Sequence, residues 1–197
     1  EVLIDGLCVS EYTEAALRKK IACVPQKAVL FRGTIRENLT WGNKNATDEE
    51  LLFATDTAEA LGVVEEKGGL DGKIEQGGKN LSGGQRQVVT LLMCTIVPPK
   101  LLLLDEHTAA LDPKTAKTVL EMTNKVVTEN NLTTLMVTHN MNDAIKYGNR
   151  LIMMDHGHVI LDIGGEEKKN LKVSDLLAKF EEVSGKEFSN DRMMLAK

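Results

Sequence analysis

The sequence has no apolar run long enough to cross a lipid bilayer. Its longest mainly apolar stretch, residues 88–97, is too short to span the hydrocarbon core and contains two threonines. The formal net charge is −5, so nothing indicates a surface that attracts nucleic acid or an anionic membrane. We therefore expect no nucleic-acid partner and no direct membrane insertion, and any membrane association would go through a protein partner.

Cysteine is also scarce. The three cysteines, Cys8, Cys23 and Cys94, are an odd number in apolar settings. This pattern predicts small buried thiols in a reducing cytosol, and it argues against a disulfide framework or a metal site. There is no signal-peptide pattern, and the chain begins at Glu1 without a methionine, so we expect a piece of a longer protein. A length of 197 residues predicts about one domain.

The segment at residues 79–112 contains the most informative pattern. Within it, LSGGQ at residues 81–85 predicts a turn that opens a helix, because Ser82 is a good N-cap and two glycines allow a ligand to approach the backbone. The free N–H groups of such a turn form an anion site. The helix is predicted to run from Arg86 to Val97 and to stop before the following Pro98-Pro99 pair.

A strand ending in two acids follows. Residues 101–104 are four leucines without polar alternation, which predicts a parallel strand buried on both faces, with Asp105 and Glu106 at its carboxyl end. Ligands of open α/β sheets bind outside the carboxyl ends of the strands. Asp105 suits a Mg²⁺ ion and Glu106 suits the orientation or deprotonation of a water molecule, so the pattern indicates phosphoryl transfer.

Local signals predict the remaining elements. Strands are expected at 2–4 and 7–9 around Asp5-Gly6, at 21–24, at 133–138, and at 151–154 and 159–163 around a turn at 155–158. Helices are expected after Thr13, after the capping box of Thr47 and Glu50, after Asp112 and Pro113, at 140–147, and after Ser174 up to Gly185. The helix after Thr47 has the apolar positions Leu51, Leu52, Ala54, Ala58 and Leu61.

The segment from residue 101 to residue 138 reads as strand, helix and strand. A right-handed crossover makes these two strands parallel and neighbouring, so Asp105, Glu106 and His139 are expected to converge. His107, His156 and His158 are interpreted as structural, since a metal site would need more ligands nearby.

LSGGQ, LLLLDE at 101–106, ALD at 110–112 and a strand ending in His139 together resemble the nucleotide-binding domain of ATP-binding cassette (ABC) transporters. The resemblance implies an α/β fold of the P-loop NTPase type: a mostly parallel sheet with a helical signature subdomain and an antiparallel β edge. Residues 1–197 would form a single ATPase domain, truncated at its N-terminus, with the helical subdomain inserted at 40–97. Two such domains would pair head to tail, as a homodimer or heterodimer, around ATP and Mg²⁺.

The resemblance also implies residue roles. Glu106 would be the catalytic base and His139 the switch that contacts the γ-phosphate, while Asp105 and Gln26 would bind Mg²⁺. The residues implied to contact the nucleotide, some of them across the dimer, are Gln26, Leu81, Ser82, Gly83, Gly84, Gln85, Asp105, Leu111 and Asp112.

Residues 28–39 resemble the exporter segment that helps to receive the coupling helix of a transmembrane subunit. Phe31 and Ile35 are either an apolar anchor for that subunit or part of the local core. Such a protein would be cytoplasmic and would lie at the membrane through its transmembrane partner.

The sequence departs from the family pattern in two ways. It contains no G-x-x-x-x-G-K-S/T, so the Walker A strand, loop and helix are missing, the sheet is expected to have an uncovered apolar slot, and this chain alone is predicted to be inactive. Residues up to about Gln87 resemble exporters, whereas the rest resembles importer ATPases. A natural hybrid, a chimera and an assembly artefact all fit this mixture.

Two other functions compete with that of a transporter ATPase. A catalytically incompetent regulatory or interaction module could supply the signature turn to a partner ATPase. An ABC protein of DNA repair or translation would share the same motifs, but the exporter-like segment favours a membrane partner. The transported substance and the direction of transport are not encoded in these motifs.

Overall fold

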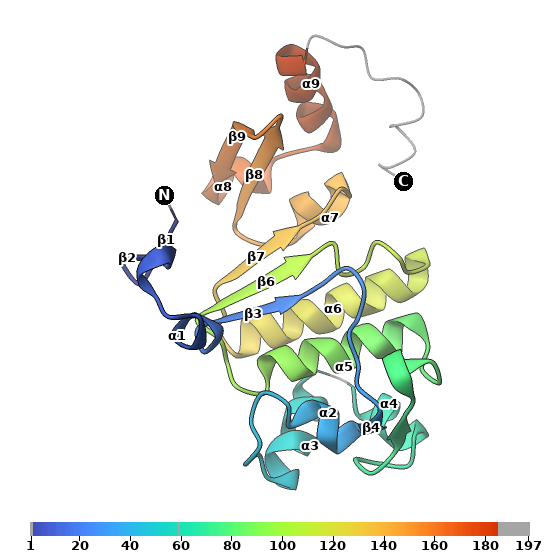
Figure 1. Cartoon of the computed structure of the whole chain (residues 1–197). Helices are drawn as coiled ribbons and strands as arrows, with labels where there is room; N and C mark the ends of the chain where they lie inside the picture. Colours follow the sequence, from blue (N-terminus) through green and yellow to red (C-terminus); the bar gives the residue numbers. More distant parts are fainter. Residues whose placement is uncertain (1, 59, 185–197) are drawn as a thin grey trace. The chain divides into compact units, whose positions relative to one another are not determined.

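The protein is described by a computed structural model, which covers residues 2–58 and 60–184 (Figure 1). The chain divides into two compact units, Glu1–Val137 and Thr138–Lys197. The two units are described separately below.

The first unit is built on a parallel sheet of three strands. Its strands are β3 (Ile21–Val24), β6 (Leu101–Asp105) and β7 (Thr134–Val137), in the order β3-β6-β7. Leu104 pairs with Val24 on one side and with Met136 on the other. The predicted parallel neighbours β6 and β7 are thus confirmed, and all three strands end at the same edge of the sheet (Figure 1).

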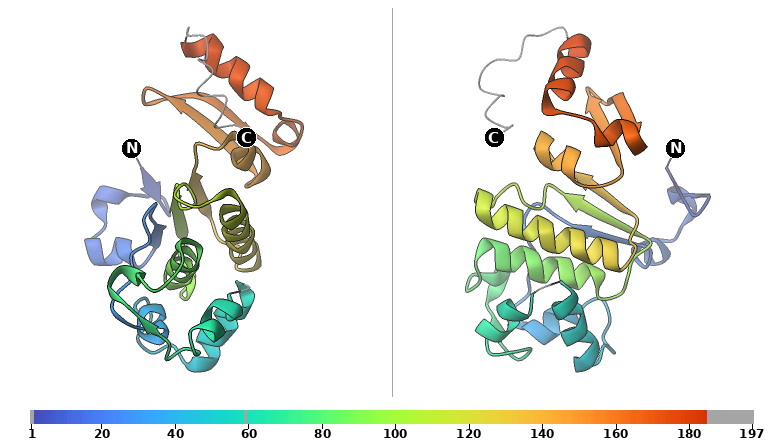
Figure 2. Two further views of the ribbon diagram at one scale, coloured as in Figure 1. Left: turned by 90° about the vertical axis from the view of Figure 1, so that its right-hand side faces the viewer. Right: turned by 180° about the vertical axis from the view of Figure 1, so that it is seen from behind.

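Two helices cover one face of this sheet. Helices α5 (Gly83–Thr95) and α6 (Pro113–Glu129) lie on the same side of the strands (Figure 2). Leu102 and Leu104 are buried in the core cluster with residues of both helices. Because β6 is a run of leucines and both helices present an apolar stripe, this face forms the main hydrophobic core.

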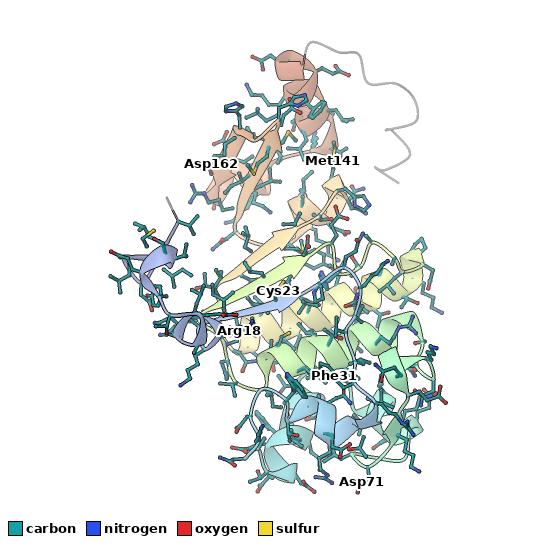
Figure 3. The ribbon with its side chains drawn as sticks, in the orientation of Figure 1. Arg18, Cys23, Phe31, Asp71, Met141 and Asp162 are labelled. Carbon is teal, nitrogen blue, oxygen red and sulfur yellow. The ribbon has the colours of Figure 1, made fainter. Side chains whose placement is uncertain are left out.

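The opposite face of the sheet is not covered in the same way. Leu103 is half-buried, while Leu135 and Val137 are 53% and 50% exposed. Cys23 on β3 is also exposed (Figure 3). The predictions that β6 is buried on both faces and that Cys23 is a buried thiol are therefore wrong, because α5 and α6 pack on one face only. This exposed apolar surface is a face of the sheet, and the expected slot at the place of a missing strand stays a prediction.

Short elements precede the sheet. The hairpin of β1 (Leu3–Ile4) and β2 (Leu7–Cys8) turns at Asp5 and Gly6, which have φ of 51° and 80°. A 3₁₀ turn, η1 (Val9–Glu11), and helix α1 (Glu14–Arg18) follow. Thr13 caps α1 by accepting a hydrogen bond from the Ala16 N–H, as predicted.

A mainly helical region lies between β3 and α5. Its elements are β4 (Gly33–Thr34), α2 (Ile35–Leu39), α3 (Asp48–Thr57), α4 (Leu61–Glu66), β5 (Lys73–Ile74) and η2 (Gln76–Gly78). The capping box at Thr47 and Glu50 opens α3 as predicted. Leu51 is fully buried, but Leu52 is 43% exposed, so the inclusion of Leu52 in the apolar face is wrong. Consecutive helical residues cannot both point into one narrow contact.

The second unit packs a hairpin against short helices. Its elements are α7 (Met141–Lys146), β8 (Arg150–Asp155), β9 (His158–Gly164), α8 (Gly165–Lys169) and α9 (Val173–Ser184). Leu151, Ile163 and Leu176 form its core. The predicted turn between β8 and β9 is confirmed, since His156 and Gly157 have φ of 47° and 82°.

The start of α9 differs from the prediction. The helix begins at Val173, so Ser174 lies inside its first turn, and Asp175 accepts the N–H of Lys172 instead. The predicted terminator Gly185 lies outside the described residues. None of the described helices combines the length and apolar character that a membrane crossing requires.

Candidate active site

Glu106 stands directly after β6 in an unusual backbone conformation. Its φ is 44°, in the left-handed region that a glutamate rarely adopts. Two backbone hydrogen bonds hold it: its N–H donates to the Val137 carbonyl at 3.1 Å, and its carbonyl accepts the Ala109 N–H at 2.9 Å. Such conformations concentrate at functional sites, where the surrounding structure enforces them.

Gln26 reaches the Glu106 carboxylate from the neighbouring strand. It follows β3 by two residues, and its Nε2 donates to Glu106 Oε2 at 3.2 Å. Asp105 is the exposed last residue of β6. Gln26 and Glu106 are thus in contact at the carboxyl edge of the sheet, where Asp105 also lies. The sequence placed Asp105 and Glu106 at this edge from the strand pattern, whereas Gln26 was assigned to the site only through the family resemblance.

Gln26 and Asp105 carry oxygen groups of the chemical kind that binds Mg²⁺. Gln26 uses its Nε2 for the hydrogen bond to Glu106, which leaves its carbonyl oxygen Oε1 as the group that could face a cation. Together with the Asp105 carboxylate, this is a set of hard oxygen donors. Mg²⁺ is usually held by one or two carboxylates together with waters and substrate phosphates, so a closed cage of protein ligands is not needed.

His107, which follows Glu106, is buried. It is 2% exposed, and its Nε2 lies 3.1 Å from the Thr123 hydroxyl on α6. That hydroxyl donates its only hydrogen to the Val119 carbonyl at 2.8 Å, so it must accept a hydrogen bond from His107 Nε2–H. Burial lowers the pKa of His107 to about 4. A neutral imidazole therefore ties the residue after Glu106 to α6.

The LSGGQ turn begins α5 as predicted. Ser82 is the N-cap: its Oγ accepts the Gln85 N–H at 3.2 Å, and Gln85 Oε1 accepts the Ser82 N–H at 3.0 Å. Gly83 and Gly84 are the first two residues of α5, so the i to i−4 pattern of the helix supplies no acceptor for their N–H groups; Gly83 is half-buried and Gly84 is buried. N–H groups at a helix N-terminus bind anions such as phosphate where a ligand can reach them.

The two glycines also allow α5 to approach the start of α6. A Cβ added at Gly83 would lie 2.9 Å from Leu111 Cδ2, and one added at Gly84 would lie 2.5 Å from Thr115 Cγ2. Asp112 caps α6 by accepting the Thr115 N–H, and hydrogen bonding with Thr115, through its side chain first and then through this N–H, lowers the pKa of the Asp112 carboxyl. The LSGGQ turn and residues 110–112 are therefore neighbours within the first unit.

Replacing Gly84 with alanine is expected to destabilise the first unit by about 1–3 kcal/mol, because the new methyl group overlaps Thr115. Urea denaturation would measure the change. Gly62 in α4 is the matched control: nothing lies within 4 Å of an added Cβ, so Gly62→Ala should be neutral or stabilise by up to about 1 kcal/mol. Combining Gly84→Ala with Thr115→Ala should restore the loss, and failure to do so would contradict the steric explanation.

The segment after Gln26 is organised by a buried asparagine. Asn38 accepts the Phe31 N–H at 2.8 Å and donates to the carbonyls of Phe31 and Thr34 at 2.9 Å. Ile35 is fully buried, so it belongs to the local core. Phe31 (labelled in Figure 3) stays 36% exposed and stacks on Trp41, with ring centroids 4.3 Å apart. The structure thus separates the two residues whose role the sequence left open.

Two predicted site residues occupy different surroundings. Leu81 is 4% exposed and lies in the core cluster, so it anchors the LSGGQ turn and does not present its side chain at the surface. His139 belongs to the second unit, where it is exposed and directly precedes Asn140, the N-cap of α7. Its convergence with Glu106 stays a prediction.

Sequence reasoning missed two residues of this region, Asn38 and Gln87. Both are buried amides that donate to backbone carbonyls of the chain around Gln26: Asn38 to Phe31, and Gln87 to Gln26 itself at 2.8 Å. The available signal was a polar residue at an otherwise apolar helical position, in α2 and in α5.

Comparison with known proteins agrees with this arrangement. The family model described as ABC transporter matches residues 1–109. The "Tyrosine transport ATP-binding protein" of Clostridioides difficile (strain R20291) is 44% identical over 191 residues, covering 92% of this chain and 74% of the relative. That match covers both the region up to about Gln87, which resembles exporters, and the region after it, which resembles importer ATPases.

Two longer relatives are named as a flippase and as an export protein. The "ATP-dependent lipid A-core flippase" of Desulfotalea psychrophila (strain LSv54 / DSM 12343) is 33% identical over 172 residues, and the "Beta-(1-->2)glucan export ATP-binding/permease protein NdvA" of Agrobacterium vitis is 31% identical over 173 residues. Each match covers 87% of this chain, but only 30% and 29% of these relatives. The chain belongs to the ABC transporter family and represents its ATP-binding component.

Proposed function

We propose that this chain hydrolyses ATP to drive transmembrane transport when it is paired with a second nucleotide-binding domain. The observation that carries the proposal is the hydrogen bond between Gln26 and Glu106, which joins two segments 80 residues apart at the carboxyl edge of the parallel sheet. In this role Glu106 takes a proton from the attacking water. Positioned general bases typically accelerate such steps by about 10²–10⁴-fold.

Other residues support the same reaction. The Asp105 carboxylate and the Gln26 carbonyl oxygen would hold Mg²⁺, which neutralises charge on the β- and γ-phosphates when it is bound. His139 would contact the γ-phosphate and keep Glu106 and the water in line. Ser82 and the N–H groups of Gly83 and Gly84 would contact the ATP held mainly by the partner domain, with Leu111 and Asp112 beside them.

A transmembrane subunit is the second proposed partner. The stacked rings of Phe31 and Trp41, together with Val29, leave an apolar surface on the segment after Gln26, with exposed fractions of 36%, 65% and 53%. Exposed aromatic side chains of this kind are common anchors of protein interfaces. Ile35, the other residue considered for this contact, is fully buried.

ATP hydrolysis by two preparations tests the proposed function. The 197-residue chain alone contains no G-x-x-x-x-G-K-S/T, so its rate is expected to match a protein-free blank. The assembled transporter that contains the chain is expected to hydrolyse Mg-ATP steadily. Steady hydrolysis by the isolated chain that disappears in the Glu106→Gln variant would contradict the predicted inactivity, and an assembly whose hydrolysis does not depend on Glu106 would favour the regulatory module.

A further inference from the structure

Gln87 links the helix that starts with LSGGQ to the residue that contacts Glu106. It lies in the second turn of α5 and is only 4% exposed. Its Nε2 donates a hydrogen bond of 2.8 Å to the backbone carbonyl of Gln26. The two residues are 61 positions apart, so this contact exists only because α5 packs against the end of β3.

Hydrogen bonds therefore hold both the backbone and the side chain of Gln26. Its backbone carbonyl accepts from Gln87, and its side-chain Nε2 donates to Glu106 Oε2 at 3.2 Å. Gln26 is exposed and follows Pro25 in a loop, so its own surroundings restrict it little. Fixing a carboxamide side chain in a loop costs conformational entropy. The hydrogen bond from the buried Gln87 holds the Gln26 backbone in place.

The side-chain oxygen of Gln87, Oε1, has an unusual environment. It is buried without a hydrogen-bond partner, and it is the one side-chain atom in this state among the described residues. The amide cannot be turned around, because Oε1 would then face the Gln26 carbonyl, which is also an acceptor. An unsatisfied buried acceptor lowers stability, so Gln87 is not explained as a stabilising core residue.

We infer that Gln87 is a positioning residue for ATP hydrolysis: it fixes the backbone of Gln26 so that the Gln26 carboxamide orients the Glu106 carboxylate. This inference rests on the proposed function, because it needs Glu106 to act as the base. It also connects two motifs physically. A displacement of α5, which begins at the LSGGQ turn, changes the support of Gln26 and through it the orientation of Glu106.

Gln87→Met in the assembled transporter tests the inference. Methionine has a similar length and is apolar, so it removes both the hydrogen bond to Gln26 and the unsatisfied oxygen. We expect kcat for ATP hydrolysis to fall about 5- to 10-fold, with KM for ATP changed less than about twofold, because one neutral hydrogen bond is lost away from the nucleotide. The melting temperature should stay the same or rise, which a purely structural role of Gln87 would not produce.

Thr90→Val is the matched control. Thr90 lies in the same helix with 4% exposure, and its hydroxyl bonds only the Arg86 carbonyl, so its loss should leave kcat unchanged. In a Gln26→Ala background, Gln87→Met should cause no further loss of kcat, because its effect passes through the Gln26 side chain. Gln87→Leu is the second variant if the methionine variant does not fold.

The outcomes separate the two proposals. If Glu106→Gln does not slow hydrolysis, the proposed function fails. If Glu106→Gln slows hydrolysis but Gln87→Met keeps the wild-type kcat, or lowers kcat equally in the Gln26→Ala background, only the role of Gln87 is overturned.

Discussion

The Glu106→Gln variant of the assembled transporter is expected to hydrolyse ATP about 10²- to 10⁴-fold more slowly than wild type. The substituted side chain has the same size, and its amide oxygen can still accept the hydrogen bond from Gln26 Nε2. It cannot take a proton from water. The loss should therefore appear in kcat, with KM for ATP little changed, when rates are measured by phosphate release.

Glu121→Gln is the control for this measurement. Glu121 lies on the exposed side of α6 and pairs only weakly with Lys117, at 4.0 Å with both side chains more than half exposed. Its substitution removes one negative charge without touching the carboxyl edge of the sheet, so the rate should stay within about twofold of wild type. A similar small effect for Glu106→Gln would show that Glu106 is not the base.

The second large effect concerns pH and His107. In the unfolded chain the imidazole binds a proton below about pH 6.5, whereas in the folded chain its pKa is about 4. Between these values the unfolded state holds more protons, so lowering the pH through this window favours unfolding. The stabilisation is complete above about pH 6.5, and about 3 kcal/mol of unfolding free energy is expected to be lost by pH 4.

Urea denaturation of wild type and His107→Gln between pH 4 and 7 measures this contribution. Glutamine can donate to the Thr123 hydroxyl but does not titrate, so the difference between the two curves isolates the imidazole from the carboxylates. His158→Gln is the control for the removal of a histidine side chain, since His158 is exposed on β9. Parallel curves for wild type and His107→Gln would contradict the buried neutral imidazole.

The local parts of this fold were predictable from the sequence. Thr13, Thr47, Ser82 and Asp112 each cap a helix where the sequence places a cap, because the side chain reaches an N–H only two or three residues away. The parallel pairing of β6 and β7 followed from the connection between them. These features depend on short stretches of chain, so neighbouring residues determine them.

Features that depend on distant contacts were not predictable in the same way. Leu103 has the same side chain as Leu102 and Leu104, but its exposure depends on which face the helices cover. Gln87 donates a hydrogen bond to the carbonyl of Gln26, 61 residues away, and no local sequence pattern identifies that partner. Ile35 and Phe31 could be told apart only once Asn38 was seen to fix the backbone between them.

The nucleotide retained by the Glu106→Gln transporter tests the central claim most directly. The assembled protein would be incubated with Mg-ATP, separated from free nucleotide and analysed for bound ATP and ADP. If the carboxylate after β6 removes the proton from the attacking water, the bound nucleotide is ATP. If the bound nucleotide is ADP, formed as fast as in wild type, hydrolysis does not depend on Glu106 and the account is contradicted.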